Sequence, residues 1–343
     1  MKRKAALIQP YFGTLPNYFR LALESYARNS DCDWYIFTDD RKHYDYPPNV
    51  VVTHTTLDRL KCMFQQKFDF PIALGRPYKL CDYRPMYGHL FADQLKDYDY
   101  WGHFDPDIIF GDIKKFLPDA ASQPYDKFCS KGHFSLYRNT PAVNLLYQLK
   151  AANCLYYKDV IASERSWGFD ERDNGVNAFF AVKGLRIYTA CPIADIYFRD
   201  YAMRLIDGAV GEREKSRQSC FAYEHGAMYR YYLLGAEIHR EEFMYIHLMQ
   251  RRMKIYSGNT SEYLIYGNAF RERVPVTREL LETANRNRTF YRFWERWKYV
   301  IYARNLKPAF RLLFVNRNLR RFAVRLLEKS RFMPGGRRKA SSR

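Results

Sequence analysis

The stretch DYWGHFDPDIIFGD, from Asp99 to Asp112, decides how this sequence folds. Its apolar residues up to Phe104 have the length and composition of a buried strand. Asp105 and Asp107 follow that strand directly. Mn²⁺ and Mg²⁺ accept carboxylate, water and phosphate oxygens as ligands. Two carboxylates at a strand end therefore indicate a divalent-cation site, although short acidic pairs are also common in surface turns.

The residues before this stretch alternate between strand and helix patterns. Apolar runs at 4–10, 33–38 and 49–54 predict buried strands, and the segments at about 17–28 and 78–95 predict helices. This alternation is typical of an open, mainly parallel α/β sheet flanked by helices. Such sheets bind ligands at the carboxyl ends of their strands, where Asp105 and Asp107 are expected.

Composition and missing motifs remove several classes of protein. The 343 residues are 47% hydrophobic and 17% aromatic, which excludes disordered, collagen-like and coiled-coil chains. The sequence has no G-x-G-x-x-G and no G-x-x-x-x-G-K-[ST] motif. A phosphate-binding site must therefore be built by other means than these glycine-rich loops.

Cysteine usage and hydropathy bear on the compartment. The seven cysteines are odd in number and contain no C-x-x-C pair, which argues against a disulfide framework or a zinc module and favours a reducing compartment. The N-terminal apolar stretch is too short for a signal peptide, and no run approaches a spanning helix. We therefore expect a cytoplasmic protein that contacts a membrane, if at all, from its inner face.

Positive charge is concentrated at the C-terminus. The formal net charge is +19, and residues 288–343 hold 17 Lys and Arg but only two Glu. Apolar residues recur at helical spacing between these charges, which predicts a basic amphipathic helical tail with about ten disordered residues at its end. Contact with anionic lipids is the favoured interpretation. Packing on the body with a solvated basic face, or binding to nucleic acid, are the alternatives.

An ordered series of motifs carries a resemblance over about residues 4–255. The sequence resembles the nucleotide-sugar glycosyltransferases of the Rossmann-like GT-A fold, and in detail an uncharacterised bacterial family of polysaccharide-locus glycosyltransferases. Each motif is weak alone, and their order makes the signal specific. The motifs are IQPYFG (8–13), WYIFTD (34–39), RPYKLCDYRP (76–85), DYWGHFDPDIIFGD (99–112), GHFSLYRN (132–139), FDERDNGVN (169–177) and YIHL (245–248).

The resemblance implies a donor site and a metal site. Residues 1–287 would form the catalytic domain, with Mn²⁺ or Mg²⁺ as cofactor. In this interpretation Asp107 is the direct metal ligand. Lys79 and Asp82 would lie at the donor, and the alternative is that they form an ordinary ion pair on the surface. The metal ligands would be Asp105, Asp107 and His247, and the donor contacts Pro10, Tyr11, Phe12, Asp39, Lys79, Asp82, Asp105, Gly132 and His133.

The acidic segment after Phe169 supplies candidate catalytic groups. An inverting enzyme needs a general base beside the acceptor hydroxyl. The resemblance implies Asp170, Glu171 and Asp173 as candidates, with helix capping as their alternative role. Pro106 in the middle of the D-x-D motif departs from the wider pattern, and the sequence does not separate a retaining from an inverting reaction.

The predicted function is therefore metal-dependent transfer of a sugar, from a UDP-sugar or another nucleotide diphosphate donor. The acceptor would be a cell-surface polysaccharide, such as capsule or lipopolysaccharide, or a lipid-linked glycan. Two alternatives remain at this point. A metal-dependent nucleotidyltransferase would use similar carboxylates, and a non-enzymatic protein would bind membranes or polyanions through its tail.

Overall fold

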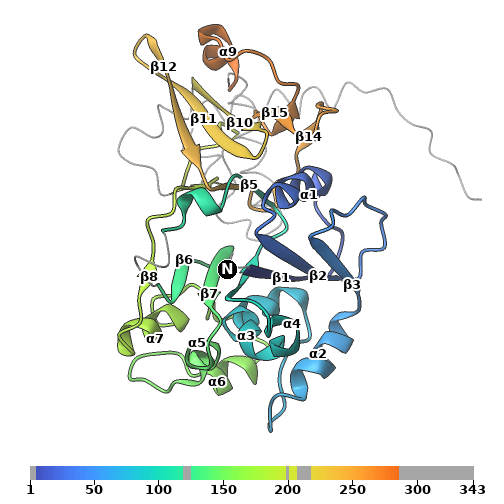
Figure 1. Ribbon diagram of the computed structural model, residues 1–343, viewed down its shortest axis with the longest axis vertical. Coiled ribbons are helices and arrows are strands. Elements are labelled where there is room, and N and C mark those ends of the chain that lie inside the picture. The colour runs from blue at the N-terminus through green and yellow to red at the C-terminus, as the bar shows by residue number, and fades with distance from the viewer. Residues whose placement is uncertain (1–4, 119–124, 198–200, 207–217, 286–343) are drawn as a thin grey trace, which may run out of the picture. The chain divides into compact units, whose positions relative to one another are not determined.

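A seven-stranded sheet in the order β3-β2-β1-β4-β7-β6-β8 forms the centre of the fold (Figure 1). The computed structural model describes residues 5–118, 125–197, 201–206 and 218–285. Neighbouring strands run parallel from β3 to β4 and between β6 and β8, whereas β7 is antiparallel to both β4 and β6. The predicted fold class, a mixed and mainly parallel sheet flanked by helices, is confirmed. The strands are β1 (Ala5–Tyr11), β2 (Cys32–Thr38), β3 (Val50–His54), β4 (Tyr100–Phe104), β6 (Lys127–Lys131), β7 (Phe134–Arg138) and β8 (Ile187–Tyr188).

Both faces of this sheet are buried. In β1, Ala5 and Leu7 enter the apolar cluster beneath α1 (Phe19–Arg28), whereas Ala6 and Ile8 enter the cluster on the opposite face. Burial on both faces explains why the parallel strands are almost continuously apolar in sequence. Short helices cover the second face: α2 (Leu57–Gln65), α3 (Tyr87–Leu90), α4 (Ala92–Leu95), α5 (Pro141–Asn144), α6 (Tyr157–Ile161) and α7 (Val176–Val182).

The helix predicted over 78–95 is broken into three pieces, which corrects the sequence interpretation. A 3₁₀-helix spans Pro77–Met86 and precedes α3 and α4. Pro85 lies inside the 3₁₀ segment, and proline has no N–H to donate and disfavours an α conformation in the residue before it. A continuous α-helix is therefore prevented at this point.

A small sheet of three strands brings distant segments to the end of β4. Its order is β5 (Ile108–Phe110), β13 (Tyr245–His247), β9 (Ile193–Asp195), with β13 antiparallel to β5 and parallel to β9. The register places His247 opposite Ile108 on one side and opposite Asp195 on the other. Since Asp107 immediately precedes β5, it lies beside His247.

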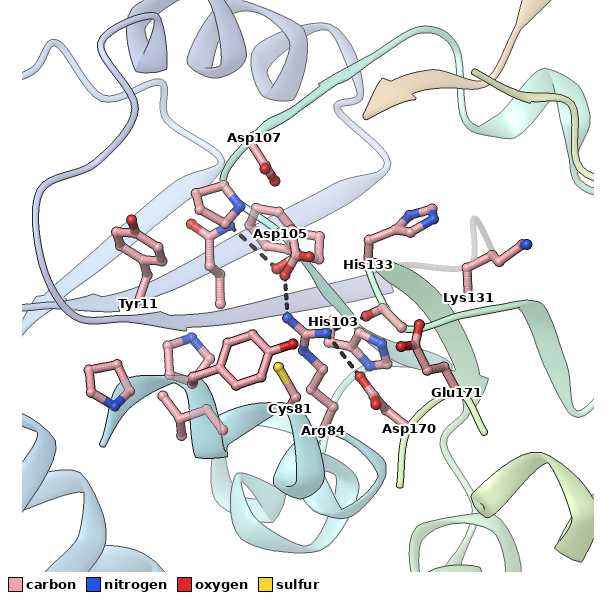
Figure 2. A pocket seen from close by; sticks show the side chains of 18 of the residues that line it. Tyr11, Cys81, Arg84, His103, Asp105, Asp107, Lys131, His133, Asp170 and Glu171 are labelled. Atoms are coloured by element: carbon pink, nitrogen blue, oxygen red, sulfur yellow. Dashed lines mark hydrogen bonds and ion pairs between the residues drawn. The ribbon is translucent and has the colours of Figure 1, made fainter. Parts of the chain in front are cut away.

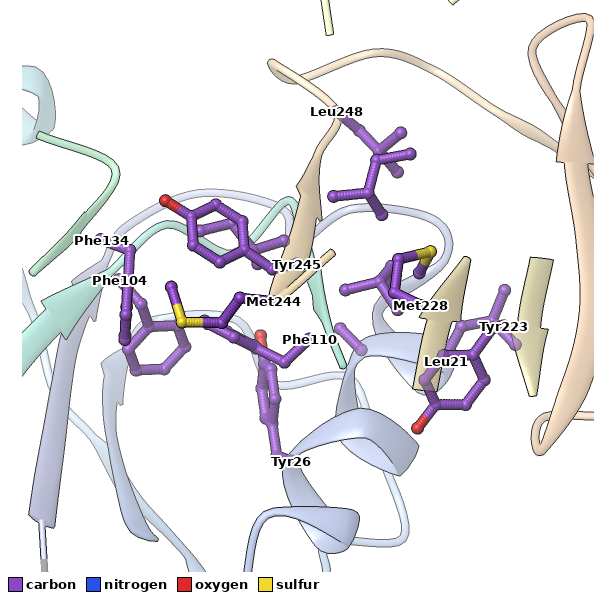
Figure 3. Close-up of a cluster of buried hydrophobic side chains, with 14 of the residues drawn as sticks. Leu21, Tyr26, Phe104, Phe110, Phe134, Tyr223, Met228, Met244, Tyr245 and Leu248 are labelled. Atoms are coloured by element: carbon purple, nitrogen blue, oxygen red, sulfur yellow. The ribbon is translucent and has the colours of Figure 1, made fainter. Parts of the chain in front are cut away.

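A six-stranded, mostly antiparallel sheet was not predicted from the sequence. Its inner residues pack on α1, where Tyr223 and Met228 join Leu21 and Tyr26 in one buried cluster (Figure 3). Short 3₁₀ segments also occur at Lys114–Phe116 and Leu146–Gln148. The sheet has the order β12 (Glu237–Phe243), β11 (Ala227–Leu234), β10 (Ser219–Glu224), β15 (Glu262–Tyr266), β16 (Ala269–Arg271), β14 (Lys254–Ile255), and α9 (Arg278–Thr283) packs on it.

Residues 1–286 form one compact unit. The predicted basic tail at 288–343 lies outside the described residues and remains a prediction. In the part of the chain that the structure describes, no helix has the length and apolar character needed to cross a membrane.

Candidate active site

A cavity of about 840 Å³ opens at the carboxyl ends of β1 and β4 (Figure 2). Asp105 and Asp107 line it from the end of β4, and Tyr11 lines it from the end of β1. The strand order reverses between β1 and β4, because β2 and β3 continue on one side of β1 and β4 lies on the other. Open α/β sheets bind their ligands at such a reversal point.

Asp105, Asp107 and His247 form a group that can hold a metal ion, because their ligand atoms lie within 4.8 Å of one another. Nε2 of His247 lies 3.5 Å from Oδ1 of Asp107 and 4.0 Å from Oδ2 of Asp105. Octahedral ligands at about 2.1 Å from a cation are about 3.0 Å apart when adjacent and about 4.2 Å apart when opposite. The observed separations lie between these two values, so small adjustments of the side chains would bring all three groups to one divalent cation.

The ionisable side chains of this group shift one another's pKa values. Burial lowers the pKa of His247, but hydrogen bonds to Asp107 and Asp195 and the charges of Asp107 and Asp105 raise it to about 10 overall. Burial raises the pKa of Asp105 to about 6 against the opposing charge of Arg84, and Asp107 adds to the rise. Burial also opposes ionisation of Asp107, yet His247 and the Gln250 N–H hold its pKa below the usual range. His247 and Asp107 thus stabilise each other's charged forms within the cluster.

Asp195 belongs to the site and was missed in the sequence. Its Oδ1 accepts a hydrogen bond from Nδ1 of His247 at 2.8 Å, which turns Nε2 of that ring toward Asp107. A carboxylate behind a metal-ligating histidine fixes the tautomer and orientation of the ring. His133 stacks on His247 with 4.3 Å between the ring centroids. The hydroxyl of Tyr245 lies 3.1 Å from Nδ1 of His133. The three-residue strand that carries Asp195 is too short to give a periodic signal in sequence.

Arg84 contacts both Asp105 of the candidate metal site and Asp170 of the acidic segment that follows Phe169 (Figure 2). Its guanidinium pairs with Asp105 and donates from Nη1 to Oδ2 of Asp170 at 2.9 Å and to the Gly132 carbonyl at 2.6 Å. Burial raises the pKa of Asp170 to about 6 despite the charge of Arg84, with a further rise from Glu171. Arg84 belongs to the motif RPYKLCDYRP (76–85), but its role at the site was not predicted from the sequence.

Gly132 allows the carboxylates to approach the backbone. A Cβ at this position would lie 2.8 Å from Oδ2 of Asp170 and 2.8 Å from Oε2 of Glu171, which is closer than real Cβ contacts. Gly132 and His133 both line the cavity, as does exposed Glu171. Asp173 is exposed and does not line the cavity, so the structure brings only two of the three candidate catalytic carboxylates together.

Of the residues expected to contact the nucleoside, some line the cavity and one does not. Pro10, Tyr11 and Phe12 line the cavity at the end of β1. Asp39 does not line it, and its Oδ1 instead accepts a hydrogen bond from the Gly13 N–H at 2.7 Å. Asp39 therefore holds the shape of the loop that follows β1.

Lys79 and Asp82, which were expected to contact the donor, do not line the cavity. Both side chains are fully buried, so they are not a surface ion pair either. Nζ of Lys79 donates to Asp82 at 2.8 Å and to the carbonyls of Val160 at 2.7 Å and Arg165 at 2.6 Å. All three ammonium hydrogens have acceptors, and none is left for a phosphate.

The fold and this site define a class: an α/β protein with an open, mainly parallel sheet and a buried Asp–Asp–His group able to hold a metal ion at a central strand end. The sequence profile of the family described as "Family of unknown function (DUF6625)" matches residues 7–274, and the chain belongs to this family.

A similar solved structure is described as the "crystal structure of a glycosyltransferase involved in the glycosylation of the major capsid of PBCV-1". That similarity has a TM-score of 0.31 and 9% sequence identity, and it covers 56% of this chain and 85% of the other. No curated protein matches the sequence.

Proposed function

We propose that this protein is a metal-dependent glycosyltransferase that moves a sugar from a nucleotide diphosphate donor, with a UDP-sugar as the first candidate. The observation that carries the proposal is the position of the Asp105–Asp107–His247 group. It lies at the carboxyl end of β4, in a large cavity at the point where the strand order reverses. An acidic, metal-competent strand end suits a ligand that brings its own phosphate oxygens.

Asp107, Asp105 and His247 would hold Mn²⁺ or Mg²⁺, with Asp195 orienting the imidazole. When bound, the cation supplies positive charge against the negative charge that develops on the departing diphosphate. Arg84 holds Asp105 in place through its ion pair and prevents that carboxylate from turning away from the cavity.

The cavity has room for the donor. Its volume of about 840 Å³ lies within the range of small-molecule sites. Pro10, Tyr11 and Phe12 would contact the nucleoside at the end of β1, and Gly132 and His133 would lie along the sugar. Aromatic and apolar surface at one end, with polar groups at the other, matches a ligand that has a base, a diphosphate and a sugar.

Glu171 is our candidate to accept the proton of the attacking hydroxyl. It is exposed within the cavity, whereas Asp170 is buried and engaged by Arg84. A general base must reach the proton that it removes. Asp170 would then position Glu171 and the sugar, and the stereochemistry of the product distinguishes this inverting route from a retaining one.

We infer the acceptor and the location of the protein from its basic C-terminal tail and from the resemblance to polysaccharide-locus glycosyltransferases. The 17 basic residues of 288–343 support attachment to the anionic inner face of a membrane, where lipid-linked glycans are assembled. A chain ending after residue 287 should turn over donor in solution but fail to float with vesicles that contain anionic lipid. A non-enzymatic membrane adaptor would show no donor turnover in either form.

The test of the proposed function is release of nucleotide from a panel of nucleotide sugars, with Mn²⁺ present or removed by EDTA. A glycosyltransferase releases the nucleoside diphosphate from at least one donor, and only with the metal. Release of pyrophosphate from a nucleoside triphosphate and a sugar phosphate would identify a nucleotidyltransferase instead. NMR of the anomeric proton of the product then reports inversion or retention.

A further inference from the structure

Two cysteines that the sequence analysis left without a role lie against each other behind the site. Cys129 and Cys191 are 62 residues apart in sequence, and their sulfur atoms are 2.9 Å apart, with the Cys129 thiol donating to the Cys191 sulfur. Both are free thiols. A disulfide bond requires about 2.05 Å between the sulfur atoms, so a small approach suffices to form it.

The backbone around Cys129 is special in a way that favours this contact. Cys129 lies where the pairing of β6 with β7 shifts register, between Phe128 and Lys131, and it has a φ of 61°. This left-handed conformation is rare for residues other than glycine. The bulge removes Cys129 from the regular ladder, and its side chain is buried in the cluster against which Cys191 packs.

We propose that Cys129 and Cys191 form a reversible disulfide when the protein meets a mild two-electron oxidant such as a peroxide. Intracellular disulfides are usually transient and redox-sensing, so a reversible bond is compatible with the expected reducing compartment. The proposal does not depend on the glycosyltransferase function.

The two thiols have unequal roles in the reaction. Cys191 is half-buried, whereas Cys129 is buried, so Cys191 is the one an oxidant reaches. The hydrogen bond from Cys129 lowers the pKa of the Cys191 thiol, and burial raises the pKa of Cys129. The Cys191 thiol gives its proton to solvent, and its thiolate attacks hydrogen peroxide. An S–O bond forms as the O–O bond breaks, which leaves a sulfenic acid, and the departing hydroxide takes up a proton from solvent and becomes water. The sulfur of Cys129 then attacks the sulfenic sulfur as its thiol proton passes to the sulfenic hydroxyl. The S–S bond forms as the S–O bond breaks, and the hydroxyl leaves with that proton as the second water.

The bond would tie together two segments that supply the wall of the candidate active site. His133 lies four residues after Cys129, and Asp195 lies four residues after Cys191. Nε2 of His133 is 3.7 Å from Oδ2 of Asp195, so the two segments already meet at these side chains. A covalent link at the cysteines fixes the strand that carries Asp195 against the hairpin that carries His133, and closing such a long loop should stabilise the fold.

The test is peptide mapping of the full-length protein. Reduced protein is treated with one equivalent of hydrogen peroxide, denatured in acid, alkylated and digested. We expect a peptide pair joined through Cys129 and Cys191, two hydrogens lighter than the reduced pair and restored by dithiothreitol. Recovery of both cysteines as alkylated thiols, or as sulfinic acids, would overturn the proposal.

Two variants provide controls. Cys62→Ser removes an exposed thiol and should leave the linked pair unchanged, whereas Cys191→Ser should abolish it. Oxidised wild-type protein should melt roughly 5 °C higher than reduced protein, and Cys191→Ser should melt at one temperature under both conditions. A link that lowers the melting temperature, or that forms only in urea, would show that the native fold does not support it.

Discussion

Two buried acid–base pairs of this protein, Lys79 with Asp82 and His247 with Asp107, have opposite surroundings. The ammonium of Lys79 has three acceptors, and Asp82 also accepts from the N–H groups of Trp167 and Phe169, so no polar atom of that pair faces the cavity.

His247 and Asp107 are almost as deeply buried as Lys79 and Asp82, but their nearest charged atoms are 3.5 Å apart and they line the cavity. An ion pair whose polar atoms all have hydrogen-bond partners stabilises the fold, whereas an acidic group with unused acceptor atoms in a cavity can bind a cation. The difference between a structural and a binding role therefore lies in the unused hydrogen-bonding capacity, and residue type alone does not reveal it.

The largest expected effect is the loss of donor turnover when the Asp107 carboxylate is removed. Asp107→Ala should lower metal-dependent donor turnover by about 10³-fold, because the direct ligand and the charge stabilisation it organises are lost. The melting temperature should change little, and circular dichroism should show an intact fold. Asp112→Ala provides the matched control, since that exposed carboxylate follows the same segment and should leave turnover within about twofold of wild type.

Removing one partner of the Lys79–Asp82 pair should lower the stability of the fold and leave Mn²⁺ binding intact. Asp82→Ala leaves the Lys79 ammonium buried without its counter-charge and should lower the free energy of unfolding by about 3 kcal/mol. Urea denaturation measures this change, and the folded protein should still bind Mn²⁺.

The double variant Lys79→Met with Asp82→Leu removes both charges and should be less destabilised than the single variant. If Asp82→Ala keeps full stability but loses nucleotide binding, this pair would return to the donor site and the comparison would fail.

Asp195→Ala should weaken Mn²⁺ binding by about 10- to 100-fold, because His247 loses the carboxylate that orients it. Electron paramagnetic resonance of free Mn²⁺ reports the affinity directly. Asp195→Asn keeps a hydrogen-bond acceptor and should recover part of the loss. Equal affinities for the alanine variant and wild type would show that Asp195 has no part in the metal site.

Metal binding should strengthen with pH, because the cation takes the place of a proton. His247 has a folded pKa of about 10 against an ordinary value of 6.5, so its proton stabilises the metal-free protein below about pH 6.5 and that contribution fades as the pH approaches 10. Apparent Mn²⁺ affinity should therefore rise about tenfold per pH unit between about pH 7 and 9.

The slope should be steeper below about pH 6, where the raised pKa of Asp105 adds a second proton. Calorimetry in two buffers of different ionisation enthalpy counts the protons released. An affinity that stays flat across this range would remove His247 from the ligand set.

The parallel half of the fold could be predicted because its signals are local. The apolar runs at β1, β2, β3 and β4 each reveal a strand, and the carboxylates after β4 follow from strand-end logic. The ordered motifs also placed His247 beside Asp107, which the register of β13 against β5 explains.

The remaining features depend on contacts between distant residues. Asp195 reaches the site only because β9 pairs with β13, and a three-residue strand shows no period. The six-stranded sheet contains strands such as β12, EIHREEF, whose mostly charged and partly exposed residues give no apolar run in sequence. Lys79 and Asp82 were expected to contact the donor, with a surface ion pair as the alternative. Their spacing in sequence does not reveal that residues 160–169 bury both side chains.

The most direct measurement is anomalous diffraction from crystals grown with Mn²⁺ and UDP. We expect a manganese peak within coordination distance of the Asp107 carboxylate and Nε2 of His247, with diphosphate oxygens completing the shell and the base at Tyr11 and Phe12. A peak elsewhere, or ordered UDP in the cavity without any metal at Asp107, would contradict it.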